Sequence, residues 1–383
     1  MFRVRLDYRL DDAHGEPGGT AHLVNPLFAL LGAIRQSGSI QRAAASLGLS
    51  YRHVWGELKR SETALARPLI VWGKGRRAHL TPFGEKLLWA EERARARIAP
   101  QIQSLASELE SAFAVAFDDS AHVLTAQASH DLVLPLFKDR LQAAGVHLDL
   151  QYCGSLDALA ALTAGKCLLA GFHVGDDHGP GSVTARAFKP HLVPGRHKLI
   201  DFIGRRQGLM VAPGNPRRIE SLADLTRTDL RFVNRQRGSG TRVEIEQLFA
   251  AQGIDERRVA GYEQEETTHL AVAATVAAGA ADAGFGIEAA ASRYGLAFVP
   301  LLSEHYYLAC LKETLSHTAV RTLIATLAGE AWRAEAAALP GYSLRDPGAI
   351  VSLTRALPWY RYRAPRARRV QHDAEQSLDT NNY

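Results

Sequence analysis

The chain has 383 residues, 46% of them hydrophobic, and a net charge of +5, which is typical of a globular protein of two or three domains. No run of about 18 apolar residues is present, so no transmembrane helix is expected, and residues 1–12 lack the apolar core of a signal peptide. The cysteines Cys153, Cys167 and Cys310 are scattered and lack metal-ligand spacing, so we expect reduced, buried thiols and a cytoplasmic protein.

The first strong pattern is a pair of short helices joined by a tight turn. Ser39 is placed to cap the first helix, Gly48 to end it and Ser50 to cap the second. Small alanines in the first helix allow the second to cross it closely, as a helix-turn-helix requires. Residues 35–97 carry thirteen Lys and Arg against five Asp and Glu, a net of +8. The excess charge therefore lies where a DNA backbone would be bound.

A basic hairpin is predicted next, with short strands at residues 69–72 and 78–80 around the sequence GKGRR. Its glycines and three cations suit contact with a minor groove or with phosphates. Thr81 and Pro82 then begin another helix, with Thr81 as the cap. In the helix from Ser50 to about Leu65, the side chains expected to face the core are Val54, Leu58 and Leu65. The residues expected to contact DNA are Ser50, Tyr51, Arg52, His53, Lys59, Lys74, Arg76 and Arg77.

These segments resemble the winged helix of the ModE and LysR-type bacterial regulators. The phrases SGSIQRAAASLGLSYRHVWGELKR and LTPFGEKLL are close to the ModE pattern over roughly residues 25–90. The resemblance implies a winged helix-turn-helix domain over residues 20–82, and a first helix is predicted from Asn25 to Gln36. The alternative is a small helical domain with a solvated basic face.

The helix that begins at Pro82 has an apolar residue at every third or fourth position, which suits pairing with a second helix. This seam consists of Phe83, Leu87, Ala90, Ala94, Ile98, Ile102, Leu105, Leu109 and Phe113. Pro100 lies inside the helix and should kink or split it. LysR-type regulators place a dimerising linker helix here, so we expect residues 83–115 to hold a homodimer or a higher homo-oligomer. The alternative is that the seam packs on its own domain.

From about His122 onward, strands and helices alternate, which favours a mostly parallel α/β sheet. The predicted strands are residues 123–126, 148–152, 168–174, 208–211, 230–233, 283–286, 298–301 and 306–311. The predicted helices are residues 130–143, 155–164, 243–251, 269–279 and 318–338. These elements are enough for two α/β lobes with a cleft. Residues 340–383 are predicted to form an irregular, basic and disordered tail.

Four predicted strand-to-helix junctions carry groups that bind anions. The segment NRQRGSGTR, residues 234–242, follows a strand and begins a helix, whose N-terminus has a partial positive charge. Ser129-His130, Gly154-Ser155 and residues 266–269 have similar chemistry. Ser and Thr also cap helices in general, so the signal is the convergence of four junctions. The glycine spacing is neither a P-loop nor a dinucleotide fingerprint, which disfavours nucleotides.

A second resemblance covers residues from about 122 to 315, which look like the periplasmic-binding-protein-like domain attached to many helix-turn-helix regulators. The phrases that carry it are VNRQRGSGTR, AGYEQEETTHLAVAATVAAGAADAGFGI, GLAFVPLLSEHYYL and QGLMVAPGNP. The resemblance implies a type II, two-lobed sensor domain over residues 120–338 that holds a ligand at helix N-termini. The ligand-binding residues that it implies are Ser129, His130, Ser155, Arg235, Ser239, Gly240, Thr241, Thr267 and His269.

A ModE-like winged helix joined to such a domain implies a DNA-binding regulator that senses molybdate, tungstate or a related small anion. Arg235, Arg237 and Arg242 keep other ligands open, because they could clamp formate or an anion with a phosphate group. They could also be structural, paired with the acidic residues Glu263, Glu265, Glu266 or Asp282. An enzyme is a further alternative, but no activated nucleophile, acid/base pair or metal triad is found. The last alternative is an anion store that no longer binds DNA. No metal or cofactor is expected apart from the effector.

Overall fold

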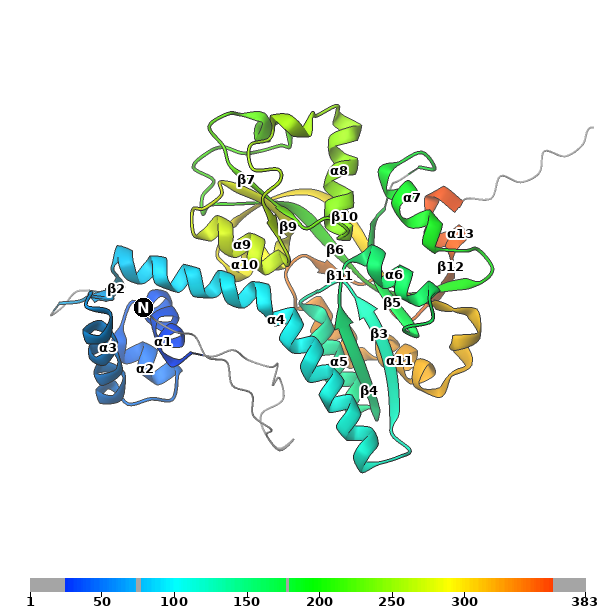
Figure 1. The fold of residues 1–383 in the computed structure, drawn as a ribbon, viewed down its shortest axis with the longest axis horizontal. Coiled ribbons are helices and arrows are strands. Elements are labelled where there is room, and N and C mark those ends of the chain that lie inside the picture. The colour runs from blue at the N-terminus through cyan, green and yellow to red at the C-terminus, as the bar shows by residue number, and fades with distance from the viewer. Residues whose placement is uncertain (1–24, 74–76, 177–178, 361–383) are drawn as a thin grey trace, which may run out of the picture.

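The computed structural model describes residues 25–73, 77–176 and 179–360. A small helical domain lies to one side of a larger α/β domain, and the long helix α4 joins the two (Figure 1). Over these residues, no helix has both the length and the apolar character that crossing a membrane requires.

The small domain has the helix-turn-helix order that the sequence predicts. It consists of α1 (Pro26–Ser37), α2 (Ile40–Ser46), α3 (Tyr51–Leu65), β1 (Ile70–Val71) and β2 (His79–Leu80). The side chains of Asn25, Ser39 and Ser50 cap the three helices by accepting from backbone N–H groups. The two strands pair antiparallel, so the expected hairpin is confirmed. Val54 and Leu58 are fully buried in the core of this domain, and Leu65 packs against it.

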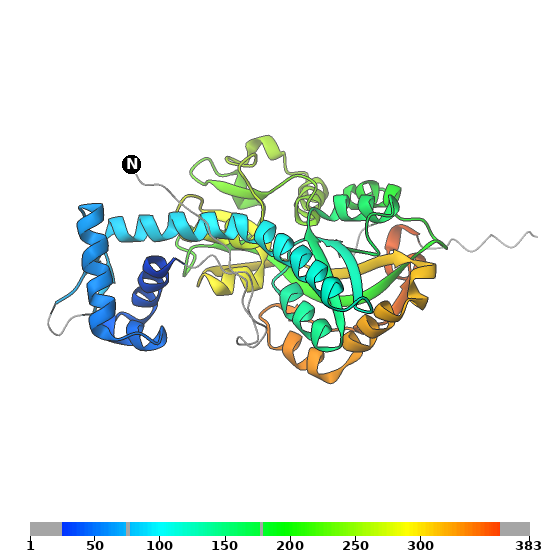
Figure 2. The same ribbon diagram turned by 60° about the horizontal axis from the view of Figure 1, so that its bottom comes forward.

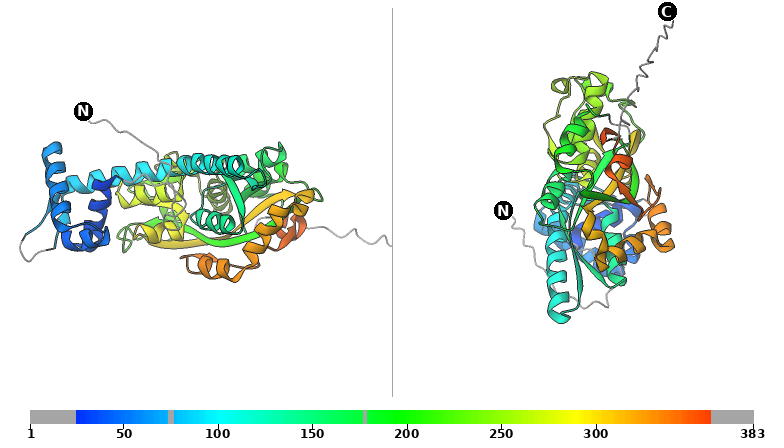
Figure 3. Two further views of the ribbon diagram at one scale, coloured as in Figure 1. Left: turned by 90° about the horizontal axis from the view of Figure 1, so that it is seen from below. Right: turned by 90° about the vertical axis from the view of Figure 1, so that its right-hand side faces the viewer.

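Helix α4 (Pro82–Phe117) runs through Pro100 without a break, so Pro100 does not split it. The helix changes direction partway along its length (Figure 1) and lies along one side of the α/β domain (Figures 2 and 3). Its buried positions are Gly84, Leu88, Glu92, Ala96, Pro100, Ser107 and Ser111. These are not the residues of the predicted seam, whose Leu105 is 55% exposed. The seam is therefore divided: Ala90, Ala94, Leu105 and Phe113 are exposed, and its other residues are half-buried.

One half of the α/β domain, here called lobe I, is built on three parallel strands. They are β3 (His122–Ala128), β4 (Val146–Tyr152) and β5 (Leu169–Gly175). The helices α5 (Val133–Ala143), α6 (Ser155–Thr163) and α7 (Val183–Phe188) follow these strands in the chain. The cores of lobe I include Leu124, Phe137, Leu148, Leu159 and Phe172, all nearly inaccessible to solvent.

The other half, here called lobe II, repeats the pattern. Its parallel strands are β7 (Phe232–Arg235), β8 (Glu265–Glu266) and β9 (Ala283–Ile287). Its helices are α8 (Gly240–Gln252), α9 (His269–Ala277) and α10 (Glu288–Arg293). Ile245, Phe249, Phe232 and Phe285 fill one of its cores.

Two 15-residue strands, β6 (His197–Val211) and β10 (Ala297–Leu311), pass through both lobes and join them. The sheet order is β4-β3-β5-β10-β6-β9-β7-β8, with the pairs β5–β10, β10–β6 and β6–β9 antiparallel. The sheet is therefore mixed, and the expectation of a mostly parallel sheet is wrong. The sequence predicts only residues 208–211 of β6, and it divides β10 into two short strands, residues 298–301 and 306–311. Pro300 lies at a register shift of β10.

The C-terminal part differs from expectation at two places. The predicted helix 318–338 is divided by Gly329 into α11 (Thr318–Ala328) and α12 (Glu330–Ala337). The expected irregular tail from Pro340 is wrong over residues 341–360, because β11 (Tyr342–Ser343) and β12 (Ile350–Ser352) pair with β6 and α13 (Leu353–Ala356) follows. Apolar burial fixes this segment, since Leu353, Leu357 and Trp359 are buried. The basic run of the predicted tail, residues 361–383, lies outside the described residues.

Candidate anion site and DNA-binding face

The carboxyl ends of β3, β4 and β7 bring three of the predicted junctions together where the lobes meet. The Ser129 and Ser155 hydroxyl oxygens, both from lobe I, are 2.7 Å apart and buried. Gly240 of lobe II lies so close that an added Cβ would be 2.9 Å from Ser155 Oγ. Next to it, the backbone N–H of Leu156 donates to the Gly238 oxygen at 3.5 Å. Lobe I and lobe II are thus in direct contact through backbone and hydroxyl groups.

The lobe II side of this junction adds a hydroxyl and an imidazole. Thr241 Oγ1 lies 3.5 Å from His269 Nε2 and accepts a hydrogen bond of 3.3 Å from Gln207 Nε2. Thr241 is the second residue of α8, His269 is the first residue of α9 and Gln207 lies on β6. All three side chains are buried. Two helix N-termini and a crossing strand therefore direct polar groups to one place, which we call the interlobe cluster, residues Ser129, Ser155, Gln207, Arg235, Thr241 and His269.

Arg235 supplies the charge of the interlobe cluster. It is 3% exposed, its Nη2 donates to the Thr267 backbone oxygen at 3.0 Å, and its Nε has no hydrogen-bond partner. Among the described residues, no carboxylate forms an ion pair with Arg235. Burial, together with the charge of Arg205, lowers the pKa of Arg235 to about 9. The guanidinium is thus still a cation at neutral pH, but one that the protein does not neutralise by direct contact.

The charge of a second buried arginine, Arg205 on β6, is neutralised by two carboxylates. Its Nε donates to Glu304 and its Nη1 to Asp131, while the Tyr342 hydroxyl donates to Asp131 Oδ1 at 2.6 Å. Burial opposes ionisation of Asp131, yet Arg205 and these hydrogen bonds hold the pKa of its carboxyl below the usual value. Arg205 thus has two carboxylate partners, whereas Arg235 has none in the part of the chain that the structure describes.

Three histidines near these arginines are held neutral. Burial, reinforced by the positive charges of Arg235 and Arg205, lowers the pKa of His130 to about 4. Burial and Arg205 likewise lower the pKa of His173 to about 4, and burial followed by Arg235 puts the pKa of His269 well below its usual value. Each imidazole therefore presents one donor and one acceptor at neutral pH.

Several buried polar atoms at and around the interlobe cluster have no hydrogen-bond partner among the residues that the structure describes. They are His173 Nε2, Arg205 Nη2, Gln207 Oε1, Arg235 Nε, His269 Nδ1 and Glu304 Oε2. Leaving such atoms unpaired costs about 1–3 kcal/mol each, so a group of them in one place indicates that a ligand or water completes the set. A small oxyanion would accept from the hydroxyls, the imidazole and the unpaired guanidinium together.

Two predicted ligand-binding residues, Ser239 and Thr267, and two arginines whose role the sequence left open, Arg237 and Arg242, have side chains that are used elsewhere. Ser239 caps α8 and donates to the Gln236 oxygen at 2.8 Å. The Thr267 side chain is exposed and directed to α4, where its hydroxyl donates to the Arg97 oxygen at 3.5 Å. Arg237 pairs with Glu263 at 2.9 Å on the surface. Arg242 pairs with Glu246 and Glu265 and covers the ring of Tyr262. Of the three arginines in this segment, Arg235 is therefore the one suited to a ligand.

His130 sits at the edge of this group, with its ring 4.9 Å from that of Tyr152. Sequence reasoning missed His173, Arg205 and Gln207, because β5 reads as an apolar strand and the first part of β6 is not predicted at all. The signal was available in the segment FIGRRQGLMV, where Arg205 and Gln207 stand in alternation within an apolar run. Buried polar residues in an otherwise apolar strand are uncommon and therefore informative.

The helical domain has an exposed face formed by α3. Tyr51, Arg52, His53 and Lys59 are all exposed there. Tyr51 stacks on Trp55 with ring centroids 6.4 Å apart, and the Trp55 ring meets the edge of Trp72 at 4.7 Å. The Ser50 hydroxyl is occupied in capping, since it accepts from the His53 N–H at 3.2 Å. Cations and aromatic rings thus share the surface that a nucleic acid could contact.

The structure describes only part of the basic hairpin formed by β1, β2 and the residues between them. Arg77 is exposed, and its guanidinium lies beside Gly38, where an added Cβ would be 2.7 Å from Arg77 Nε. Lys74 and Arg76 lie outside the described residues.

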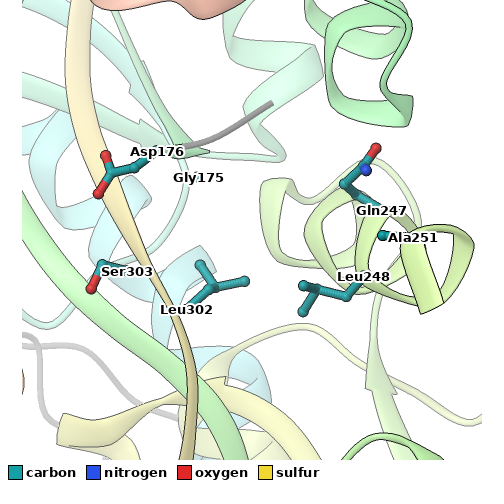
Figure 4. A pocket seen from close by; sticks show the side chains of 7 residues that line it. All are labelled: Gly175, Asp176, Gln247, Leu248, Ala251, Leu302 and Ser303. Carbon is teal, nitrogen blue, oxygen red and sulfur yellow. The ribbon is translucent and has the colours of Figure 1, made fainter. Parts of the chain in front are cut away.

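A separate hollow of about 380 Å³ lies between α8 and β10 in the α/β domain (Figure 4). It is lined by Gly175, Asp176, Gln247, Leu248, Ala251, Leu302 and Ser303. It contains none of the predicted ligand-binding residues.

Comparison with known families divides the chain in the same order. A model of the bacterial regulatory helix-turn-helix proteins of the lysR family matches residues 27–85, and a model of the PBP superfamily domain matches residues 138–328. The uncharacterized protein YvgK of Bacillus subtilis (strain 168) is 32% identical over 225 residues, which are 58% of this chain and 72% of that protein. The molybdenum-pterin-binding protein MopB of Rhodobacter capsulatus is 38% identical over 85 residues, 21% of this chain and 32% of that protein.

Solved structures that match this chain include full-length BenM, with 16% identity and a TM-score of 0.41 over 81% of this chain and 96% of that one. CbnR, a LysR family transcriptional regulator, gives 17% identity and a TM-score of 0.37 over 78% of this chain and 98% of that one.

Proposed function

The chain belongs to the bacterial regulators that carry a LysR-type helix-turn-helix ahead of a PBP superfamily domain, and we propose that it controls transcription in response to a small anion bound at the interlobe cluster. The helix-turn-helix binds DNA, and the PBP superfamily domain binds the effector. We propose the identity of the effector, the place where it binds and the oligomeric state of the protein.

The observation that carries the anion assignment is the buried Arg235, which has no carboxylate partner among the described residues. A buried guanidinium without a counter-ion is unfavourable, and an anion between the lobes would neutralise it. Donors stand next to it, since the Ser129, Ser155 and Thr241 hydroxyls and His269 lie in the same buried cluster. Their number suits an oxyanion with several equivalent oxygens.

The anion class that we favour is the molybdate or tungstate type. Most donors of the interlobe cluster are neutral hydroxyl, amide and imidazole groups, and only Arg235 is an uncompensated cation. The similarity of 85 residues of this chain to a protein named as molybdenum-pterin-binding supports this choice. Formate is the alternative, because a single guanidinium also suits a small carboxylate.

The exposed seam of α4 supports a dimer. Of the seam residues, Leu105 is 55% exposed and Phe113 is 40% exposed, and Phe117, which follows the seam at the end of the same helix, is 90% exposed. Covering these residues with the same helix of a second chain would remove them from water. The proposed regulator is therefore a homodimer, or a larger assembly of such dimers, that binds DNA through two helix-turn-helix domains.

The experiment that tests this function is DNA binding measured with and without anions. An operator would first be selected from random DNA with the full chain, and its affinity then measured with molybdate, tungstate, sulfate or formate present. We expect one of these anions to change the affinity for the operator at least fivefold, without changing non-specific binding. Operator binding that none of them changes would contradict the proposed effector class while leaving the DNA-binding assignment intact.

A further inference from the structure

Helix α4 is attached to both lobes, each at a different part of its length. Ahead of Pro100, Arg97 donates from Nε and Nη2 to the two carboxylate oxygens of Glu266 in lobe II, both at 2.6 Å. Beyond Pro100, Ser107 Oγ donates to the Leu148 oxygen at 2.7 Å and accepts from the Leu150 N–H at 2.9 Å. These two backbone groups belong to β4 of lobe I. Pro100 therefore stands between the attachment to lobe II and the attachment to lobe I.

Pro100 also leaves a backbone acceptor free. In a regular helix the N–H of residue 100 would bond the oxygen of Ala96, but proline has no N–H. The Thr268 hydroxyl of lobe II donates to this Ala96 oxygen at 3.0 Å, and both groups are buried. The same Thr268 oxygen caps α9 by accepting from the Ala271 N–H at 2.9 Å. The Thr268 hydroxyl thus replaces the hydrogen bond that Pro100 cannot donate in α4, and it also caps α9, the helix that carries His269.

The neighbours of Thr268 belong to the interlobe cluster. The Thr267 backbone oxygen accepts from Arg235, and His269 lies against Thr241. Within the three consecutive residues 267–269, Thr267 and Thr268 contact α4, while Thr267 and His269 contact groups that would hold the anion. A movement of lobe II relative to lobe I must change α4 between its two attachments. At this place a side chain, that of Thr268, supplies the hydrogen bond to the Ala96 oxygen that the helix backbone would otherwise make.

We propose that the Thr268–Ala96 hydrogen bond is the joint through which anion binding between the lobes changes the bend of α4 at Pro100, and so the position of the winged helix on DNA. This inference rests on the proposed function, because it takes the interlobe cluster as the effector site. The coupling is a difference in contacts between two states, and it is reciprocal: the anion changes DNA affinity by the same factor by which DNA changes anion affinity.

The test compares Thr268→Val, which removes the hydroxyl at nearly constant shape, with Thr268→Ser, which keeps both hydrogen bonds. Operator affinity of the full chain would be measured with and without saturating molybdate, or formate if formate is the anion that binds. We expect the wild type and Thr268→Ser to show the same anion-dependent ratio, and Thr268→Val to show a ratio near one. A full ratio in Thr268→Val would overturn the proposal.

Loss of the α9 cap is a separate effect of Thr268→Val, and Pro100→Ala controls for it. That variant leaves Thr268 intact but restores the missing helix N–H, so we expect it to reduce the anion-dependent ratio while keeping anion affinity within about threefold. If no anion binds the wild type, the proposed function fails and the joint is tested by hydrogen exchange. Amides of residues 101–104 should then exchange several-fold faster in Thr268→Val than in Thr268→Ser, and equal rates would contradict the joint.

A different observation concerns Gly56, in the middle of α3. Val54 and Leu58, two positions away on either side, are fully buried, so Gly56 lies on the opposite face of the helix. A Cβ added at Gly56 would meet no atom within 4 Å, so packing within the chain does not require a glycine. Glycine inside a helix is nevertheless less favourable than alanine. Arg52 and Arg60, one turn to either side, are exposed.

We infer that Gly56 is the position of closest approach of α3 to the edges of the base pairs. Without a side chain there, the helix backbone can enter the major groove more deeply, and Arg52 and Arg60 then reach the groove on either side. The glycine would thus be retained for contact with DNA at a cost in helix stability, as is common where function and stability compete.

This inference is tested by Gly56→Ala with Gly32→Ala as the matched control, because Gly32 is also inside a helix, α1, with open space around it. Both variants should raise the melting temperature by a few degrees. Only Gly56→Ala should weaken operator binding, by tenfold or more, with binding to random DNA changed less than threefold. Operator affinity that Gly56→Ala leaves unchanged, or a melting temperature that it lowers, would overturn the inference.

Discussion

Arg235 Nη2 donates to the backbone oxygen of Thr267 at 3.0 Å, so the uncompensated guanidinium of the interlobe cluster is bound directly to the segment that contacts helix α4. The guanidinium of Arg235 is therefore bonded to the residue next to Thr268. Binding an anion would change the electrostatic environment of Arg235 and, through this carbonyl, the position of residues 267–269.

Contact between the lobes should depend on the absence of a side chain at Gly240. A Cβ there would lie 2.9 Å from Ser155 Oγ and 3.3 Å from the His173 oxygen, both tighter than ordinary contacts. Gly240→Ala should therefore hold the lobes apart and weaken anion binding about tenfold or more, as measured by isothermal titration. Its melting temperature without anion should change little. Wild-type anion affinity in this variant would show that the lobes need not meet there.

The recognition helix should read sequence through Arg52. This side chain is exposed near the start of α3, where such helices contact base edges. If Arg52 binds a guanine, Arg52→Ala should cost about 1–3 kcal/mol at one base position and leave non-specific binding nearly intact. Competition measurements on operator variants would detect the change. Equal losses on specific and random DNA would assign Arg52 to phosphate contact instead.

The seam of α4 should hold a dimer. Because Leu105 is 55% exposed within one chain, Leu105→Asp should leave the fold of that chain intact. In a dimer, however, the aspartate would be buried without a partner, which is costly. Sedimentation at micromolar concentration should find the wild type dimeric and the variant largely monomeric, with similar circular dichroism spectra. A variant that is still dimeric would place the interface elsewhere.

Stability should fall in mild acid because buried histidines are held neutral. The pKa of His173 is about 4 in the folded chain, against 6.5 for an unperturbed histidine, so the unfolded chain binds the extra proton first. Its contribution is complete above pH 6.5 and is lost as the pH falls toward 4, at about 1.4 kcal/mol per pH unit. Asp131 titrates below this window, since its pKa is lowered as well.

Denaturant unfolding at pH 5.0 and 7.5, without anion, measures this loss. His173→Gln should lose less stability on acidification than the wild type, by about 2 kcal/mol over this range. His79→Gln, at an exposed position, is the control and should behave as the wild type does. Identical acid sensitivity in His173→Gln and the wild type would show that the pKa of His173 is the same in the folded and the unfolded chain.

Local signals in the sequence are sufficient for the helix-turn-helix. Ser39, Ser50 and Thr81 cap helices at the predicted places, because capping depends on residues only three positions apart. The interlobe cluster is predicted in part for the same reason, since Ser155, Thr241 and His269 lie at strand-to-helix junctions. Arg205 and Gln207 could not be found this way, because their role depends on β6 crossing between lobes, which is a long-range pairing.

The three arginines also show that local patterns in the sequence do not reveal contacts between distant residues. The sequence leaves ligand contact and structural pairing open for Arg235, Arg237 and Arg242. Only the fold shows that Glu263 and Glu265 reach Arg237, and that Glu265 and Glu246 reach Arg242. The prediction of an irregular tail is wrong over residues 341–360 for a related reason. Trp359 is buried against residues of lobe I that are far away in the sequence, and no local pattern indicates this contact.

The measurement that tests the central claim most directly is isothermal titration of the full chain with molybdate, tungstate, sulfate and formate, repeated on Arg235→Gln and Arg237→Gln. Arg235 is buried and lacks a carboxylate partner among the described residues, whereas Arg237 is exposed and paired with Glu263. We expect molybdate or tungstate to bind the wild type and Arg237→Gln alike, and Arg235→Gln at least tenfold more weakly. Equal affinity in Arg235→Gln, or no binding of any of the four anions to the wild type, would contradict an anion site at the interlobe cluster.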